Sequence, residues 1–102
     1  MQGVAIEEIG ALRRRLGIED NELHGQVGRL RVGDLVRLTF LPPEQPEAGE
    51  TLSVRITSIR HDRFRGRLIG PPARRALARL RPGALIGFTE GQIHSVASPR
   101  HP

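Results

Sequence analysis

Hydrophobic and polar residues alternate along two stretches in the middle of the chain, residues 35–41 and residues 52–57. Alternation with a period of two is typical of a strand that buries one face and exposes the other. We therefore predict two strands here. The apolar side chains predicted to face inward are Val36, Leu38, Phe40, Leu52, Val54 and Ile56.

A tight hairpin follows the second of these strands. Residues 60–63 read Arg-His-Asp-Arg, and Ile59 breaks the alternation just before them, which predicts a bulge or the end of the strand. The return strand then places Phe64, Gly66 and Leu68 inward. Its outward side chains are Arg63, Arg65 and Arg67.

Helical patterns flank this region. Apolar residues at positions 9, 12 and 16, with acidic residues early, arginines late and a glycine at position 17, predict a helix over residues 4–16. Residues 17–29 are predicted to be a linker with at most one helical turn, because Gly25 and Gly28 interrupt them. A short helix is predicted near 73–80, after Pro72.

The remaining segments complete a β-rich domain. Residues 42–49, with three prolines, are predicted to form an exposed loop, residues 84–88 a further strand, and residues 93–96 a short last strand or a 3₁₀ turn. About five strands separated by tight turns predict a small, partly open barrel of the SH3-like or OB-like kind, mainly β within the α+β class. The expected organisation is an N-terminal helix and linker (1–29), a barrel domain (30–97) and a frayed tail (98–102).

Composition limits the classes of protein. The chain has 102 residues, which suits one domain, and it has no cysteine, which excludes disulfides and thiolate metal sites. No secretory signal precedes the first arginine, and no apolar run approaches the ~18 residues of a membrane span. We therefore expect a cytoplasmic protein with no membrane contact.

Charge is divided unevenly along the chain. Residues 1–50 carry 6 Arg and 9 acidic residues (−3), whereas residues 51–102 carry 10 Arg and 2 acidic residues (+8). All 16 basic residues are arginine. Guanidinium groups suit phosphates and carboxylates, but a GC-rich genome also favours arginine codons, and the abundance of Ala, Gly and Pro favours that second explanation.

The sequence predicts no catalytic group, metal or cofactor. The four histidines do not have metal-ligand spacing, and the glycines do not form a phosphate-binding loop. His61 and Asp62 are adjacent and suit an acid–base pair, but a solvated turn is the expected interpretation. His94 and Ser95 are expected to point to opposite faces of a strand, which excludes a nucleophile–base pair.

A set of turn and core residues also matches a known pattern. Gly49-Glu50 leads into Val54, residues 62–68 read Asp-x-Phe-x-Gly-x-Leu, and Leu80-Arg-Pro-Gly83 precedes an apolar strand. Over residues 30–96 this resembles the bacterial YegJ-type domain of unknown function. Members of that family often carry one tryptophan at the position of Ser53 and another near Val96, and this chain has no tryptophan. The resemblance implies the fold and no activity.

The outward arginines are the candidate site. They would form a ridge that binds an acidic protein partner, which is the function we expect for a non-enzymatic interaction module; nucleic-acid phosphates are the alternative ligand. Pairing with the chain's own acidic N-terminal half fits the charge distribution equally well, and a solvated outer face without a ligand is the simplest interpretation. The N-terminal helix is a second contact surface, through which Ile6, Ile9, Leu12 and Leu16 would pack on the barrel or on a second copy of the chain. The candidate site residues are Arg55, Arg60, Arg63, Arg65, Arg67, Arg74 and Arg75.

Overall fold

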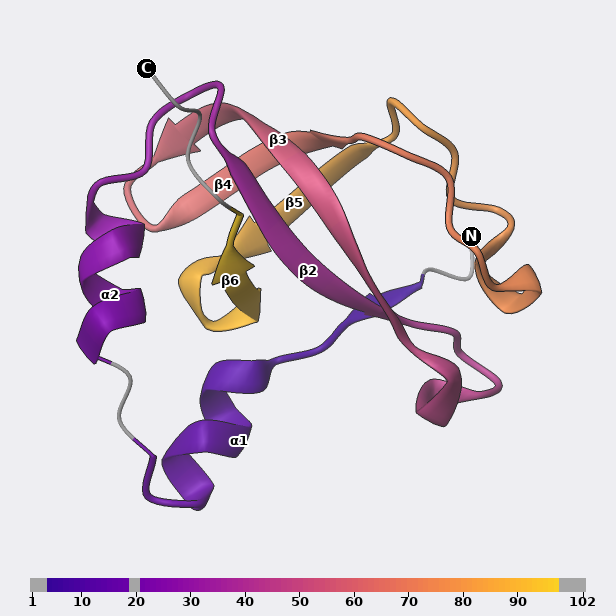
Figure 1. The fold of residues 1–102 in the computed structure, drawn as a ribbon, viewed down its shortest axis with the longest axis horizontal. Helices are drawn as coiled ribbons and strands as arrows, with labels where there is room; N and C mark the ends of the chain where they lie inside the picture. Colours follow the sequence, from indigo (N-terminus) through magenta and orange to yellow (C-terminus); the bar gives the residue numbers. More distant parts are fainter. Residues whose placement is uncertain (1–3, 19–20, 98–102) are drawn as a thin grey trace.

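The structure is a computed structural model that describes residues 4–18 and 21–97. Five antiparallel strands form a nearly closed barrel, on one side of which two N-terminal helices lie (Figure 1). The strands are β2 (Leu35–Leu41), β3 (Glu50–Arg60), β4 (Arg63–Leu68), β5 (Leu85–Thr89) and β6 (Ile93–Val96).

The order of the strands explains why the barrel nearly closes. Strands β2 to β5 pair with their neighbours in sequence, and β6 then returns to pair with β2. A 3₁₀ turn, η3 (Glu90–Gln92), makes this return possible; Thr89 and Gln92 cap it reciprocally. Strands that follow one another in the sequence are therefore neighbours in the barrel, and only the last strand returns to the first. The predicted small barrel is confirmed.

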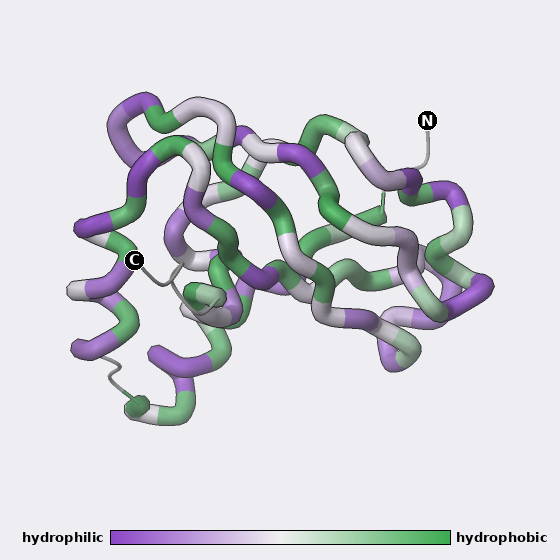
Figure 2. Tube along the Cα trace, turned by 45° about the horizontal axis from the view of Figure 1, so that its top comes forward, coloured by the Kyte–Doolittle hydropathy of each residue, from purple (hydrophilic) through white to green (hydrophobic). Residues whose placement is uncertain are grey.

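The predicted alternation decides which side chains fill the barrel. Along β2 and β4 every second residue is buried, and hydrophobic and hydrophilic stretches alternate along the trace (Figure 2). Phe64 and Phe88 face each other across β4 and β5 and stack with their ring centroids 5.3 Å apart. The largest fully buried side chains are Phe40, Leu38, Ile56, Leu68, Leu77, Ile93, Val36 and Val54.

Two local features shape the hairpin of β3 and β4. The pairing shifts register between Ile56 and Ser58, so the predicted bulge exists but lies before Ile59. Gly66 faces inward where the strands approach closely: a Cβ there would lie 2.5 Å from the carbonyl oxygen of Arg55 and 2.5 Å from Cγ1 of Val54. Glycine is therefore required at this position by packing.

The predicted N-terminal helix is wrong at its start. Residues Ala5–Ile6 form a short strand, β1, that pairs with the end of β2, and the amide of Glu7 donates to the carbonyl of Thr39 at 2.8 Å. Helix α1 covers only Ile9–Arg15. Ile6, which fits a helical pattern, is instead half-buried in this strand, where pairing with β2 also satisfies the backbone.

The predicted linker contains a second helix, α2 (Asn21–Gly28). Leu23 and Val27 are spaced i, i+4 and both pack against the core, with Val27 buried. Tertiary packing of this face outweighs the cost of the glycines within the segment, which is about 1 kcal/mol for each one in a helix interior.

The connection from β4 to β5 closes one end of the barrel. The short helix predicted near 73–80 is a single 3₁₀ turn, η2 (Arg75–Leu77), whose Leu77 is completely buried. The carboxylate of Glu50 accepts hydrogen bonds from the backbone amides of Ala73 and Arg74 at 2.8–3.0 Å and holds this connection against the start of β3. A further 3₁₀ turn, η1 (Pro46–Ala48), lies in the predicted proline-rich loop. The predicted tail, residues 98–102, lies outside the described residues.

Candidate binding surface

Five of the predicted arginines share the outer face of the β3–β4 hairpin. Across the hairpin, Arg60 lies directly opposite Arg63, and Arg55 lies directly opposite Arg67. Arg65 lies between these pairs, opposite Ser58. Directly opposite residues of an antiparallel pair project from the same side of the sheet. We call this surface the arginine face; its members are Arg55, Arg60, Arg63, Arg65 and Arg67, all of them exposed.

No member of the arginine face forms an ion pair with another residue in the described part of the chain. Arg55 and Arg67 each donate a hydrogen bond to a turn carbonyl, that of Gly33 at 2.9 Å and that of Gly83 at 3.0 Å. Among the described residues, the ion pair joins His24 to Glu90 and involves no member of the face. Two of the guanidinium groups are therefore held in place by neutral oxygens, and the charge of the face is directed at solvent.

This arrangement opposes folding stability. Like charges directly opposite each other on two strands are destabilising, whereas opposite charges at such positions contribute roughly 0.2–1 kcal/mol. The hairpin contains two like-charge pairs, Arg55 with Arg67 and Arg60 with Arg63. The hydrogen bonds of Arg55 and Arg67 offset part of this cost, and local conflicts of this kind occur at functional surfaces.

The structure does not bring Arg74 and Arg75 onto the arginine face. Arg74 directly precedes η2 and Arg75 is its first residue. The amide of Arg74 donates a hydrogen bond to Glu50 at the start of β3. Arg60 lies at the other end of the same strand. Of the seven predicted site residues, these two therefore belong to a separate surface at the opposite end of β3 from the hairpin turn.

The hairpin turn itself carries no acid–base pair. His61 has a positive φ of 54°, as the reversal of the chain requires, and both His61 and Asp62 are exposed. No hydrogen bond joins their side chains in the described part of the chain. They are occupants of a solvated turn that orients the flanking arginines.

The prediction that His94 and Ser95 point apart is wrong. Nδ1 of His94 lies 3.2 Å from Oγ of Ser95, and Arg37 donates a second, 3.4 Å hydrogen bond to that hydroxyl. The cause is an irregularity in the β2–β6 pairing, in which Arg37 is paired with Ser95 and Leu38 with Ile93. The skipped residue breaks the alternation of side chains. No described residue orients the imidazole of His94 through its other nitrogen, as a catalytic arrangement would need.

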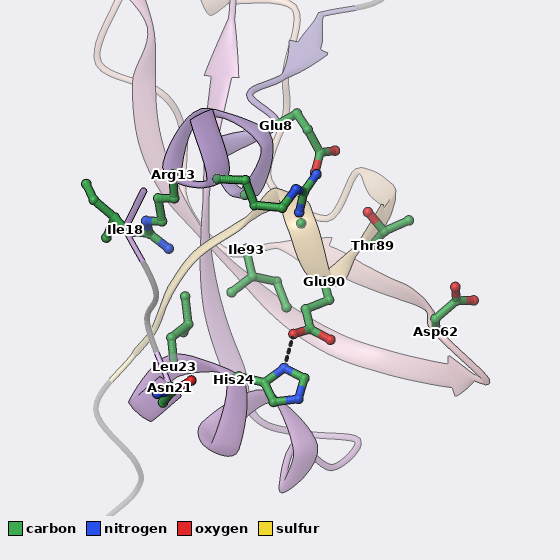
Figure 3. A pocket seen from close by; sticks show the side chains of 13 residues that line it. Glu8, Arg13, Ile18, Asn21, Leu23, His24, Asp62, Thr89, Glu90 and Ile93 are labelled. Atoms are coloured by element: carbon green, nitrogen blue, oxygen red, sulfur yellow. Dashed lines mark hydrogen bonds and ion pairs between the residues drawn. The ribbon is translucent and has the colours of Figure 1, made fainter. Parts of the chain in front are cut away.

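A groove that the sequence did not indicate lies between α1, α2 and η3 (Figure 3). It has a volume of about 720 Å³, and the His24–Glu90 pair, with 2.6 Å between Nδ1 and Oε2, crosses it. Its walls carry both carboxylates and guanidinium groups, so its charge selects no class of ligand. The charged side chains along it are Glu8, Arg13, Arg14, His24, Asp62 and Glu90.

Most of the apolar side of helix α1 packs against other parts of the same chain. It packs against η3 and β6, where Gly10 approaches Gly91 so closely that a Cβ on Gly10 would lie 3.1 Å from the neighbouring Cα. Ile9 and Leu12 are half-buried, and Ile6 belongs to β1. Leu16 alone of the four predicted contact residues is largely exposed, at 64%. Self-association through this helix stays a prediction.

The chain was compared with family models, curated proteins and solved structures. No family model, curated protein or solved structure matches it. The resemblance to the YegJ-type family therefore stays a prediction. None of the described helices is long and apolar enough to cross a membrane. Within residues 4–18 and 21–97, no three histidine or acidic side chains are grouped so that they would hold a metal ion.

Proposed function

We propose that the protein is a non-enzymatic interaction module whose arginine face binds an acidic segment of a protein partner. The observation that carries the proposal is the concentration of five exposed guanidinium groups on one hairpin, none of which forms an ion pair with another described residue. Arginine suits this role because its planar fork binds carboxylates in a bidentate manner.

The spacing of the arginines favours a polypeptide ligand in extended conformation. Along β4 the arginines recur at every second residue, which corresponds to a repeat of roughly 6.8 Å. Alternate side chains of an extended acidic segment have the same repeat. A strand-like partner with a carboxylate at every second position therefore matches Arg63, Arg65 and Arg67 one to one.

Binding of single-stranded nucleic acid has less support. Such proteins combine positive charge with exposed aromatic rings on which bases stack. The chain contains no tryptophan or tyrosine, and its three phenylalanines, Phe40, Phe64 and Phe88, are all buried. The arginine face thus offers contacts to phosphates but no platform for bases.

The experiment compares two polyanions. A labelled peptide in which Glu and Thr alternate and an oligonucleotide of equal net charge are titrated by fluorescence anisotropy, with an alternating Lys–Thr peptide as the control. We expect the Glu–Thr peptide to bind. Its affinity should fall about ten-fold as the ionic strength rises from ~0.01 M to ~0.15 M, where the Debye length shortens from ~30 Å to ~8 Å. Tighter binding of the oligonucleotide would replace the proposal, and binding of neither would refute it.

A further inference from the structure

Strand β5 is an unprotected edge beside the arginine face. In the described sheet β5 pairs with β4 and with no other strand. Proteins usually protect such an edge with charges, proline or a covering element. The sequence of β5, Leu-Ile-Gly-Phe-Thr, contains neither charge nor proline, and Leu85 at its start is 52% exposed.

The hydrogen-bonding pattern identifies the free backbone groups. The amide of Leu68 donates to the carbonyl of Ala84, so Ala84 and every second residue after it face β4. The amide of Thr89 points away from β4 and donates a hydrogen bond to Oε1 of Gln92 at 3.0 Å. By the same alternation Leu85 and Gly87 direct their amides and carbonyls to the open edge. No described residue bonds them there.

The side chains next to this edge are those of the arginine face. On the outer side of the sheet Arg67 lies opposite Leu85, Arg65 opposite Gly87 and Arg63 opposite Thr89. Gly87 is exposed, and a Cβ built on it would meet a single atom within 4 Å, the carbonyl oxygen of Phe64 at 3.9 Å. No side chain therefore fills the space above Gly87, and Arg65 can reach across it to a ligand bound at the edge of β5.

We propose that the acidic partner segment binds as an added antiparallel strand on β5, with its carboxylates on the outer side, facing Arg63, Arg65 and Arg67. This proposal rests on the proposed function and specifies how the ligand is held. The backbone of Leu85 and Gly87 supplies main-chain hydrogen bonds, and the arginines select acidic residues. Two strand spacings, roughly 10 Å, separate the added strand from β4, a gap that long arginine and glutamate side chains span over Gly87.

A pair of substitutions at one residue tests the edge. Gly87→Pro removes the amide that faces the edge but no hydrogen bond to β4, whereas Gly87→Ala keeps the amide and adds a methyl group in open space. We expect Gly87→Pro to bind the Glu–Thr peptide about ten-fold or more weakly than Gly87→Ala, because only the proline removes the amide that faces the edge; equal affinities of the two variants would contradict strand addition. Thermal unfolding by circular dichroism checks that both variants fold.

Modified peptides provide the same test without any substitution in the protein. In an antiparallel addition the residues opposite Leu85 and Gly87 both point outward and bond to β5. N-methylation of the Glu residues should therefore abolish binding, whereas N-methylation of the Thr residues should preserve it. Equal affinities of the two methylated peptides would overturn strand addition. If the unmodified peptide binds and loses affinity only when the arginines are changed, the arginine face is the binding surface but strand addition on β5 is wrong. If the unmodified peptide does not bind the wild-type protein, both proposals are wrong.

Discussion

Changing Arg63, Arg65 and Arg67 together to glutamate is expected to reduce the affinity for the Glu–Thr peptide by about 100-fold or more. Each exposed ion pair contributes up to roughly 1 kcal/mol, and three such contributions amount to about a hundred-fold in the dissociation constant. Repulsion between like charges adds to this loss. Fluorescence anisotropy at low ionic strength measures the effect.

The same triple variant should unfold at a temperature equal to or above that of the wild-type protein. The substitutions at positions 67 and 63 would place carboxylates opposite Arg55 and Arg60, which converts two repulsive pairs into attractive ones. The lost hydrogen bond from Arg67 to the carbonyl of Gly83 offsets part of this gain. A matched control, Arg14, Arg15 and Arg29 changed to Glu, alters the net charge equally on the N-terminal side and should retain binding to within a few-fold. Equal loss in the control, or unfolding of the hairpin variant, would contradict a dedicated binding face.

Gly66→Ala is expected to lower the free energy of unfolding by about 2–3 kcal/mol. The added methyl group would lie 2.5 Å from the backbone carbonyl oxygen of Arg55, so relief requires β3 and β4 to separate. Overpacking of a filled core costs roughly 1–3 kcal/mol, and here the obstructing atom belongs to backbone and cannot rotate away. Urea unfolding monitored by circular dichroism measures the loss, which is a large share of the stability of a small domain.

Gly87→Ala is the control for that substitution. It makes the same chemical change on the strand next to β4, but on the outer side, where the nearest atom lies 3.9 Å from the new Cβ. Reduced flexibility of the unfolded chain should make it neutral or slightly stabilising. Equal destabilisation by the two alanines would show that strand propensity, and not the close approach at Gly66, decides the cost.

The hairpin was predictable because its apolar and polar residues alternate, and this alternation follows from burying only one side of the strands. Phe64 and Leu68 must face the core, so the arginines between them must face outward, whatever the rest of the barrel does. The partner strand and the turn follow from local chain reversal. The arginine face was therefore predictable from the sequence, apart from its exact register.

Residues whose role depends on distant contacts were not predictable. The segment Ala5–Ile6 fits a helical pattern, yet it pairs with the end of β2, more than thirty residues away in the sequence. Val27 gains its burial from the barrel, so α2 forms despite its glycines. The contact between His94 and Ser95 depends on the irregular pairing of β6 with β2. Arg74 and Arg75 share a charge with the arginine face, but the chain's path separates them from it.

The open edge of β5 was likewise hidden, since sequence alone does not show which strand lacks a second neighbour. Its one local signal is Gly87, a glycine at an outward strand position where packing does not require it.

Amide and arginine side-chain chemical shifts of the labelled protein, recorded while the Glu–Thr peptide is added, test the central claim most directly. We expect the largest changes on the arginine face and on Leu85 and Gly87, while the signals of α1 and α2 stay unchanged. Changes centred on the groove between α1, α2 and η3, or changes absent from the hairpin, would contradict it.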